Sequence, residues 1–106
     1  MGTKERTAWK PVMGSGLEKV KRILPVFGHH DWYALDHKIR GKTVFLRDHG
    51  TKTLYVVGTD GYAYSLQSWS WSIPYADIQA LVRVAITGDL PAPRSAGIYR
   101  NLRVRS

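Results

Sequence analysis

The sequence predicts a small α+β domain, an antiparallel meander of about four to five strands with two helices packed on one face, in the order α-β-β-β-β-α-β. Runs rich in β-branched and aromatic residues alternate with turn residues from Trp32 to Gln67. A segment with helical apolar spacing lies on each side of this stretch. The chain has 106 residues, 43% of them hydrophobic, which is typical of a single folded domain with one core. We expect residues 14–106 to form this domain and residues 1–13, which lack an apolar period, to form a mobile N-terminal arm anchored only by Trp9.

The first helix is expected over residues 15–24. Ser15 and Glu18 have the spacing of a capping box, in which both side chains accept hydrogen bonds from free backbone N–H groups at a helix start. Pro25 cannot continue the helical hydrogen bonds. The apolar residues at helical spacing are Leu17, Val20, Ile23 and Leu24.

The clearest hairpin joins residues 43–47 to residues 53–57. Both segments are rich in residues that favour strands, and Asp48-His49-Gly50 between them is typical of a turn. Each neighbouring segment adds a strand to this hairpin.

Before the hairpin, alternating residues predict a strand over 33–39, which Arg40-Gly41-Lys42 turns back onto the next strand. After it, Thr59-Asp60-Gly61 predicts a second tight turn. The turn leads into a strand over 62–66, with Tyr62, Tyr64 and Leu66 on one face.

The second helix opens at Pro74 and stops at Gly88. Its apolar positions, which follow the helical period, are Ile78, Leu81, Val82, Ala85 and Ile86. Residues 88–97 have the composition of a loop. The last apolar residues, which alternate on one side of a final strand, are Ile98, Leu102 and Val104. Arg100 falls on that same side, so this segment is expected to be an edge strand or a basic C-terminal tail.

The net charge of +8 is distributed unevenly along the chain. Residues 1–53 carry +6 and residues 83–106 carry +4, whereas residues 54–82 carry −2 and contain no lysine or arginine. The small protein is therefore basic at its two ends and neutral and aromatic in its middle, a pattern that informs about partners rather than fold.

The aromatic middle is the first candidate binding surface. Uncharged aromatic surface is typical of the centre of protein interfaces. The leading hypothesis is a non-enzymatic binding module that engages a protein partner or forms a homodimer. Burial of the two indoles in the core is the alternative, and the absence of nearby cations argues against base stacking by them. The candidate residues are Trp69, Trp71, Tyr75, Tyr62 and Tyr64.

The basic ends support an alternative function, electrostatic binding of nucleic acid. No sequence motif for reading bases is present, so such binding would act through phosphates. A solvated basic surface is the simpler reading of the same residues. The candidate phosphate contacts are Lys19, Lys21, Arg22, Arg40, Lys42, Arg100, Arg103 and Arg105.

A third hypothesis is a metal-dependent hydrolase or nuclease. Imidazole and carboxylate side chains together can bind a divalent metal, and the weak candidates are His37, His49, Asp36 and Asp48. Their spacing matches no established metal motif, and turn chemistry explains the same residues. We therefore expect no catalytic residues, no metal site and no cofactor.

The run from Gly58-Thr59-Asp60-Gly61-Tyr62 through Trp69-Ser70-Trp71 to Asp77-Ile78, together with the arginine-rich tail, is similar to small uncharacterised bacteriophage-encoded domains. The resemblance covers the middle third of the chain. It implies a phage-like setting in which a non-enzymatic protein binds and redirects a host component, and it assigns no site residue.

Three further features indicate a cytoplasmic protein that does not enter membranes. No apolar run approaches the roughly 20 residues that span a bilayer, and no signal peptide starts the chain. The sequence contains no cysteine, so disulfides and thiolate zinc sites are excluded.

Overall fold

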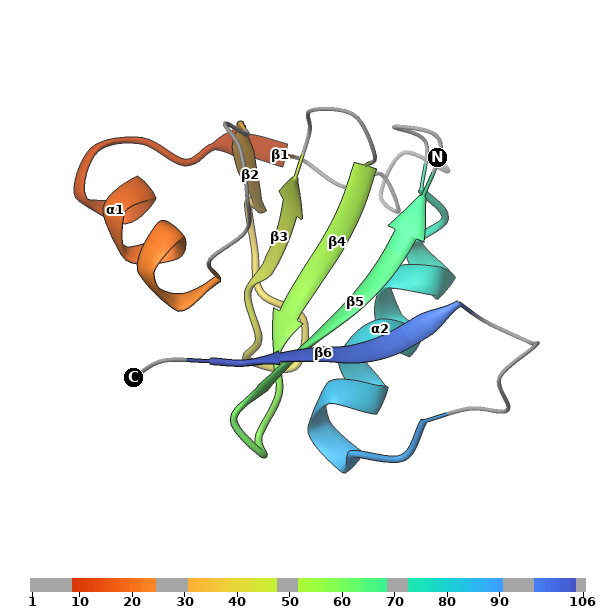
Figure 1. Ribbon diagram of the computed structural model, residues 1–106. Coiled ribbons are helices and arrows are strands. Elements are labelled where there is room, and N and C mark those ends of the chain that lie inside the picture. The colour runs from red at the N-terminus through yellow and green to blue at the C-terminus, as the bar shows by residue number, and fades with distance from the viewer. Residues whose placement is uncertain (1–8, 25–30, 48–51, 69–72, 91–96, 105–106) are drawn as a thin grey trace.

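The computed structural model describes residues 9–24, 31–47, 52–68, 73–90 and 97–104. Six antiparallel strands form one sheet in chain order, and a helix lies on each side of it (Figure 1). The predicted α+β meander is therefore confirmed. The elements are β1 (Trp9–Pro11), α1 (Gly14–Ile23), β2 (Trp32–Leu35), β3 (Val44–Arg47), β4 (Lys52–Val57), β5 (Tyr62–Ser68), α2 (Tyr75–Thr87) and β6 (Ile98–Arg103). None of the helices in these described ranges is long and apolar enough to cross a membrane.

The two helices lie on opposite faces of the sheet, so the expectation that both pack on one face was wrong. In β4, Leu54 and Val56 join the cluster under α2, whereas Tyr55 and Val57 join the cluster under α1. The physical reason is that β3 and β4 are apolar at successive positions. Strands of this kind need cover on both faces.

Helix α2 forms the larger layer and matches its prediction. Pro74 occupies the N-cap, and Gly88 ends the helix in a left-handed conformation with φ of 80°. The Gly88 N–H donates to the Val84 carbonyl at 2.7 Å, which satisfies one of the free carbonyls at the helix end. The side chains of α2 that lie buried against the sheet are Ile78, Leu81, Val82, Val84 and Ala85.

Helix α1 is present where it was predicted, but its capping box is not. The helix begins at Gly14 with Met13 at the N-cap, and no side-chain hydrogen bond caps this described terminus. Ser15 therefore lies inside the first turn instead of preceding it. Val20 and Leu24, 3% and 1% exposed, attach the helix to Trp32 and the neighbouring sheet residues.

Residues 9–11, which were expected to belong to the N-terminal arm, form strand β1. Trp9 lies opposite Leu35 of β2 and packs against the α2-side cluster. Lys10 adds an ion pair with Asp36 at 2.9 Å. Residues 1–8 lie outside the described part of the chain.

The strand predicted over 33–39 ends at Leu35, but the turn that follows is where the sequence places it. Ile39 and Lys42 exchange backbone hydrogen bonds of 3.1 and 2.9 Å. Arg40 and Gly41 between them have φ of 52° and 76°, as expected for a two-residue turn of the type that matches strand twist. The turn at Asp48-His49-Gly50 lies outside the described residues, although β3 and β4 pair as predicted.

Strand β6 is an edge strand, and its predicted alternation is interrupted. Ile98 packs on the α2 side of the sheet, whereas Val104 packs on the α1 side. Between its pairs with Tyr64 and Tyr62, the strand advances from Arg100 to Arg103, three residues against two in β5. This bulge changes which face the later residues occupy. Of the loop expected over 88–97, residues 91–96 are outside the described part.

Candidate functional site

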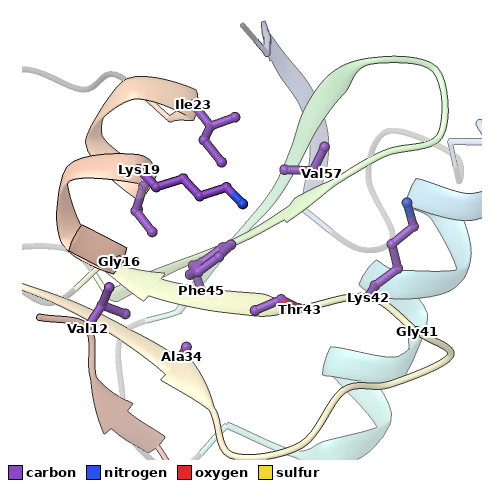
Figure 2. Close-up of a pocket in the computed structure, with 11 residues that line it drawn as sticks. Val12, Gly16, Lys19, Ile23, Ala34, Gly41, Lys42, Thr43, Phe45 and Val57 are labelled. Atoms are coloured by element: carbon purple, nitrogen blue, oxygen red, sulfur yellow. The ribbon is translucent and has the colours of Figure 1, made fainter. Parts of the chain in front are cut away.

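A groove of about 390 Å³ lies between α1 and the sheet (Figure 2). One face of α1, at the i, i+3, i+4 and i+7 positions, supplies Gly16, Lys19, Val20 and Ile23. The central strands supply Ala34 from β2, Phe45 from β3 and Val57 from β4. The segments beside them supply Val12, Gly41, Lys42 and Thr43. The groove is therefore built by the helix, three strands and the β2–β3 turn together.

Small residues leave this space unfilled. Gly16 on α1 and Ala34 on β2 face the groove from opposite sides and project little or no side chain into it. Phe45 and Val57, both half-buried, form apolar walls that remain in contact with solvent. A concave apolar surface of this size is a common form of binding site.

Two lysines give the groove its charge. Lys19 extends from α1 over Phe45 toward Val57, and Lys42 stands at the other end beside Thr43 (Figure 2). Neither ammonium group forms an ion pair with a carboxylate in the described ranges. Apolar walls with unpaired cations suit a ligand that combines an apolar group with an anionic one.

A second charged cluster lies where β5 and β6 meet. The guanidinium carbons of Arg100 and Arg103 lie 4.9 and 5.5 Å from the centroid of the Tyr62 ring. These are distances at which a cation is attracted to an aromatic face. Arg100 also lies 3.9 Å from a carboxylate oxygen of Asp60, at the long limit of an ion pair.

Asp60 fixes the turn between β4 and β5. Its Oδ2 accepts a hydrogen bond of 2.7 Å from the hydroxyl of fully buried Tyr64, and its Oδ1 accepts one of 3.1 Å from the Tyr62 N–H. The Tyr64 hydrogen bond is the main cause that lowers the pKa of Asp60 below its usual value. Burial, followed by the Asp60 carboxylate, raises the pKa of Tyr64.

These pKa shifts predict that the free energy of unfolding falls at acidic pH, the acid limb, and falls again at alkaline pH, the alkaline limb. A lowered pKa for Asp60 means that its stabilisation is present above the unfolded value of 3.8 and is lost as pH falls through the folded value. A raised pKa for Tyr64 means that stability falls as pH rises above 10.0. Urea unfolding across the pH range checks both limbs. Asp60→Asn should weaken the acid limb and Tyr64→Phe the alkaline limb, and unchanged slopes in both variants would contradict the assignment.

The aromatic candidates do not form one surface among the described residues. Tyr64 lies fully in the core, so its expected place in a binding surface was wrong. Tyr62 is half-buried beneath two arginines, and Tyr75 is half-buried at the start of α2. Trp69 and Trp71 lie outside the described residues, so their role stays a prediction.

The basic candidates separate into several groups. Lys19 and Lys42 line the groove. Arg100 and Arg103 meet over Tyr62. The exposed candidates elsewhere are Lys21 and Arg22 on α1 and Arg40 in the β2–β3 turn. Arg105 is outside the described part.

The metal candidates are not brought together in the part of the chain that the structure describes. His37 is exposed, and Asp36 pairs with Lys10. No group of three potential metal ligands occurs within the described ranges. Asp48 and His49 lie outside them.

Sequence reasoning missed the apolar groove residues Val12, Ala34, Phe45 and Val57. A signal for two of them was present, since Phe45 and Val57 alternate with the residues that face α2. Apolar residues on both faces of a strand indicate a second packed layer.

No family model matches the chain, and no curated protein or solved structure is significantly similar to it.

Proposed function

We propose that this protein is a non-enzymatic protein-interaction module that binds an acidic segment of a partner through the groove between α1 and the sheet. An apolar side chain of the partner fills the space above Phe45, and neighbouring carboxylates meet Lys19 and Lys42. The observation that supports this proposal is the half-exposed apolar groove with two unpaired lysines.

The chemistry of the lining favours binding over catalysis. The described lining contains neither a carboxylate nor an imidazole, and Thr43 offers its only hydroxyl. General acid–base catalysis usually relies on such groups. Apolar contact flanked by cations is instead a means of recognising acidic partners with an apolar anchor.

An acidic partner suits this surface better than a second copy of the chain. A copy would bring its own net charge of +8 to the lysine-flanked groove. Homodimerisation, the other form of the interaction hypothesis, is therefore disfavoured electrostatically.

The proposal also includes a biological setting for this binding. The resemblance to phage-encoded domains supports a role in binding a host protein, and the sequence supports a cytoplasmic location. Neither inference is needed for the groove to be tested.

Filling the groove is expected to weaken partner binding. Ala34→Phe places a large ring in the space that the partner's apolar side chain would occupy, so the affinity for a labelled Gly-Glu-Phe-Glu-Leu-Gly peptide should fall at least tenfold. Lys19→Ala with Lys42→Ala should lower it about fivefold through lost charge pairing. Fluorescence anisotropy at low salt measures both effects.

Matched variants separate the groove from the rest of the surface. Ala80→Phe adds the same ring at an exposed position of α2, and Lys21→Ala removes an exposed lysine of α1 that does not line the groove. Both should bind the peptide like the wild type. Undiminished binding by a folded Ala34→Phe variant would refute the proposal. A wild-type dimer that Ala34→Phe dissociates would replace the acidic partner with a second copy.

A further inference from the structure

A second cavity, of about 280 Å³, lies at the corner of the sheet where β1 ends. Pro11 is the last residue of β1, and the N–H of Val12 donates to the Trp32 carbonyl at 2.8 Å. The chain then leaves the sheet and begins α1 at Gly14. The residues that line this corner pocket are Pro11, Val12, Leu17, Asp31, Trp32 and Tyr33.

Asp31 gives the corner pocket a negative charge. Its side chain is exposed and forms no ion pair within the described ranges. Lys10 of β1 is instead paired with Asp36 at 2.9 Å. Val12 and Leu17 supply half-buried apolar surface beside this carboxylate. A long basic side chain suits such a pocket, because its methylene stem lies on apolar residues while its charged end meets the carboxylate.

The corner pocket adjoins the groove between α1 and the sheet. Val12, at one end of the groove in Figure 2, also lines the corner pocket. On α1, Gly16 borders the groove and its neighbour Leu17 borders the pocket. On β2, Ala34 borders the groove and its neighbour Tyr33 borders the pocket. One extended segment of a partner can therefore reach both cavities.

The two cavities carry opposite charges. Lys19 and Lys42 line the groove without a carboxylate partner in the described ranges, whereas Asp31 lines the pocket. A partner segment that slides along this surface would bring like charges together. Opposite charges at neighbouring positions therefore fix the register of a bound segment.

We propose that the corner pocket binds a lysine or arginine side chain of the partner, about three residues from the apolar anchor that the groove binds. Neighbouring strands lie roughly 4.8 Å apart, which places β1 on the order of 10 Å from the space above Phe45 on β3. About three extended residues span this distance. The inference rests on the proposed function and adds a basic position to the partner's acidic segment.

Peptides that differ in one side chain test the pocket. The parent peptide Gly-Glu-Phe-Glu-Leu-Gly has no basic residue and reports on the groove alone. Gly-Arg-Ser-Glu-Phe-Glu-Leu-Gly and Gly-Glu-Phe-Glu-Leu-Arg-Gly place an arginine three residues before or after the phenylalanine, for the two chain directions. In one of them, replacing arginine with citrulline, which keeps the shape and loses the charge, should weaken binding about threefold, as for an exposed ion pair. Fluorescence anisotropy at about 50 mM salt measures the affinities.

Variants of the protein assign this preference to one carboxylate. Asp31→Asn should abolish the preference for arginine over citrulline, and Asp31→Lys should reverse it. Asp89→Asn removes an exposed carboxylate that lines neither cavity and should keep the preference. Equal effects of Asp31→Asn and Asp89→Asn would reduce the preference to net charge and overturn the pocket.

The parent peptide separates failure of the pocket from failure of the groove. If it binds and Ala34→Phe weakens its binding, but neither longer peptide prefers arginine, the pocket is refuted and the groove stands. If the parent peptide does not bind the wild type, the groove is refuted and the basic position with it.

Discussion

Replacing Gly58 with alanine is expected to lower the free energy of unfolding by about 2 to 3 kcal/mol. A β-carbon at this buried position would lie 2.5 Å from Cε1 of Tyr64 and 2.9 Å from Oδ1 of Asp60. Tyr64 cannot retreat easily, because its ring is fully buried and its hydroxyl is bonded to Asp60. Urea unfolding followed by circular dichroism measures the change.

Two further variants show whether the cause is steric. Gly61 has φ of 85° but open space around its missing side chain, so Gly61→Ala should cost only the backbone strain of about 1 kcal/mol. Tyr64→Leu removes the ring that the new methyl group would strike, so the losses from Gly58→Ala and Tyr64→Leu should be less than additive in the double variant. Full additivity would exclude the clash as the cause.

Truncating Leu24 is expected to lower the stability of the fold and to weaken peptide binding to the groove. Leu24 is 1% exposed and packs in the cluster that attaches the helix to the sheet. Leu24→Ala should lower the free energy of unfolding by about 3 kcal/mol, as buried leucine truncations commonly do. Peptide binding to the groove should fall as well, since α1 forms one of its walls. Urea unfolding measures the loss of stability, and fluorescence anisotropy measures the loss of peptide binding.

Leu90 offers the matched control for this substitution. It is 46% exposed after the end of α2, so Leu90→Ala makes the same chemical change outside the core and should cost less than about 0.5 kcal/mol. Peptide binding that survives Leu24→Ala unchanged would mean that α1 does not form the site.

The central strands and α2 were predictable because their signals are local. The hairpin of β3 and β4 follows from β-branched runs around a turn, and α2 follows from its apolar period between Pro74 and Gly88. Strand β1 could not be found in this way. Its three residues become a strand only by pairing with β2, on the far side of α1 in the sequence.

The candidate sites depended even more on contacts between distant segments. Lys19 and Lys42 were selected for their charge alone, and the sequence offered no sign that Ala34 and Phe45 would lie between them. The association of Arg100 and Arg103 depends on a bulge, which moves one residue out of register and has no local signature here.

The chain order of the strands has a consequence for how the protein reaches its native state. Each strand pairs only with its immediate predecessor and successor, and just two of these pairings span a helix. Native contacts of short sequence separation require little chain entropy to close, so such topologies fold quickly. The four strands β2, β3, β4 and β5 can pair through turns alone, and each helix then adds its layer together with an edge strand. On this order of folding, the groove between α1 and the sheet is completed only when α1 joins the paired strands.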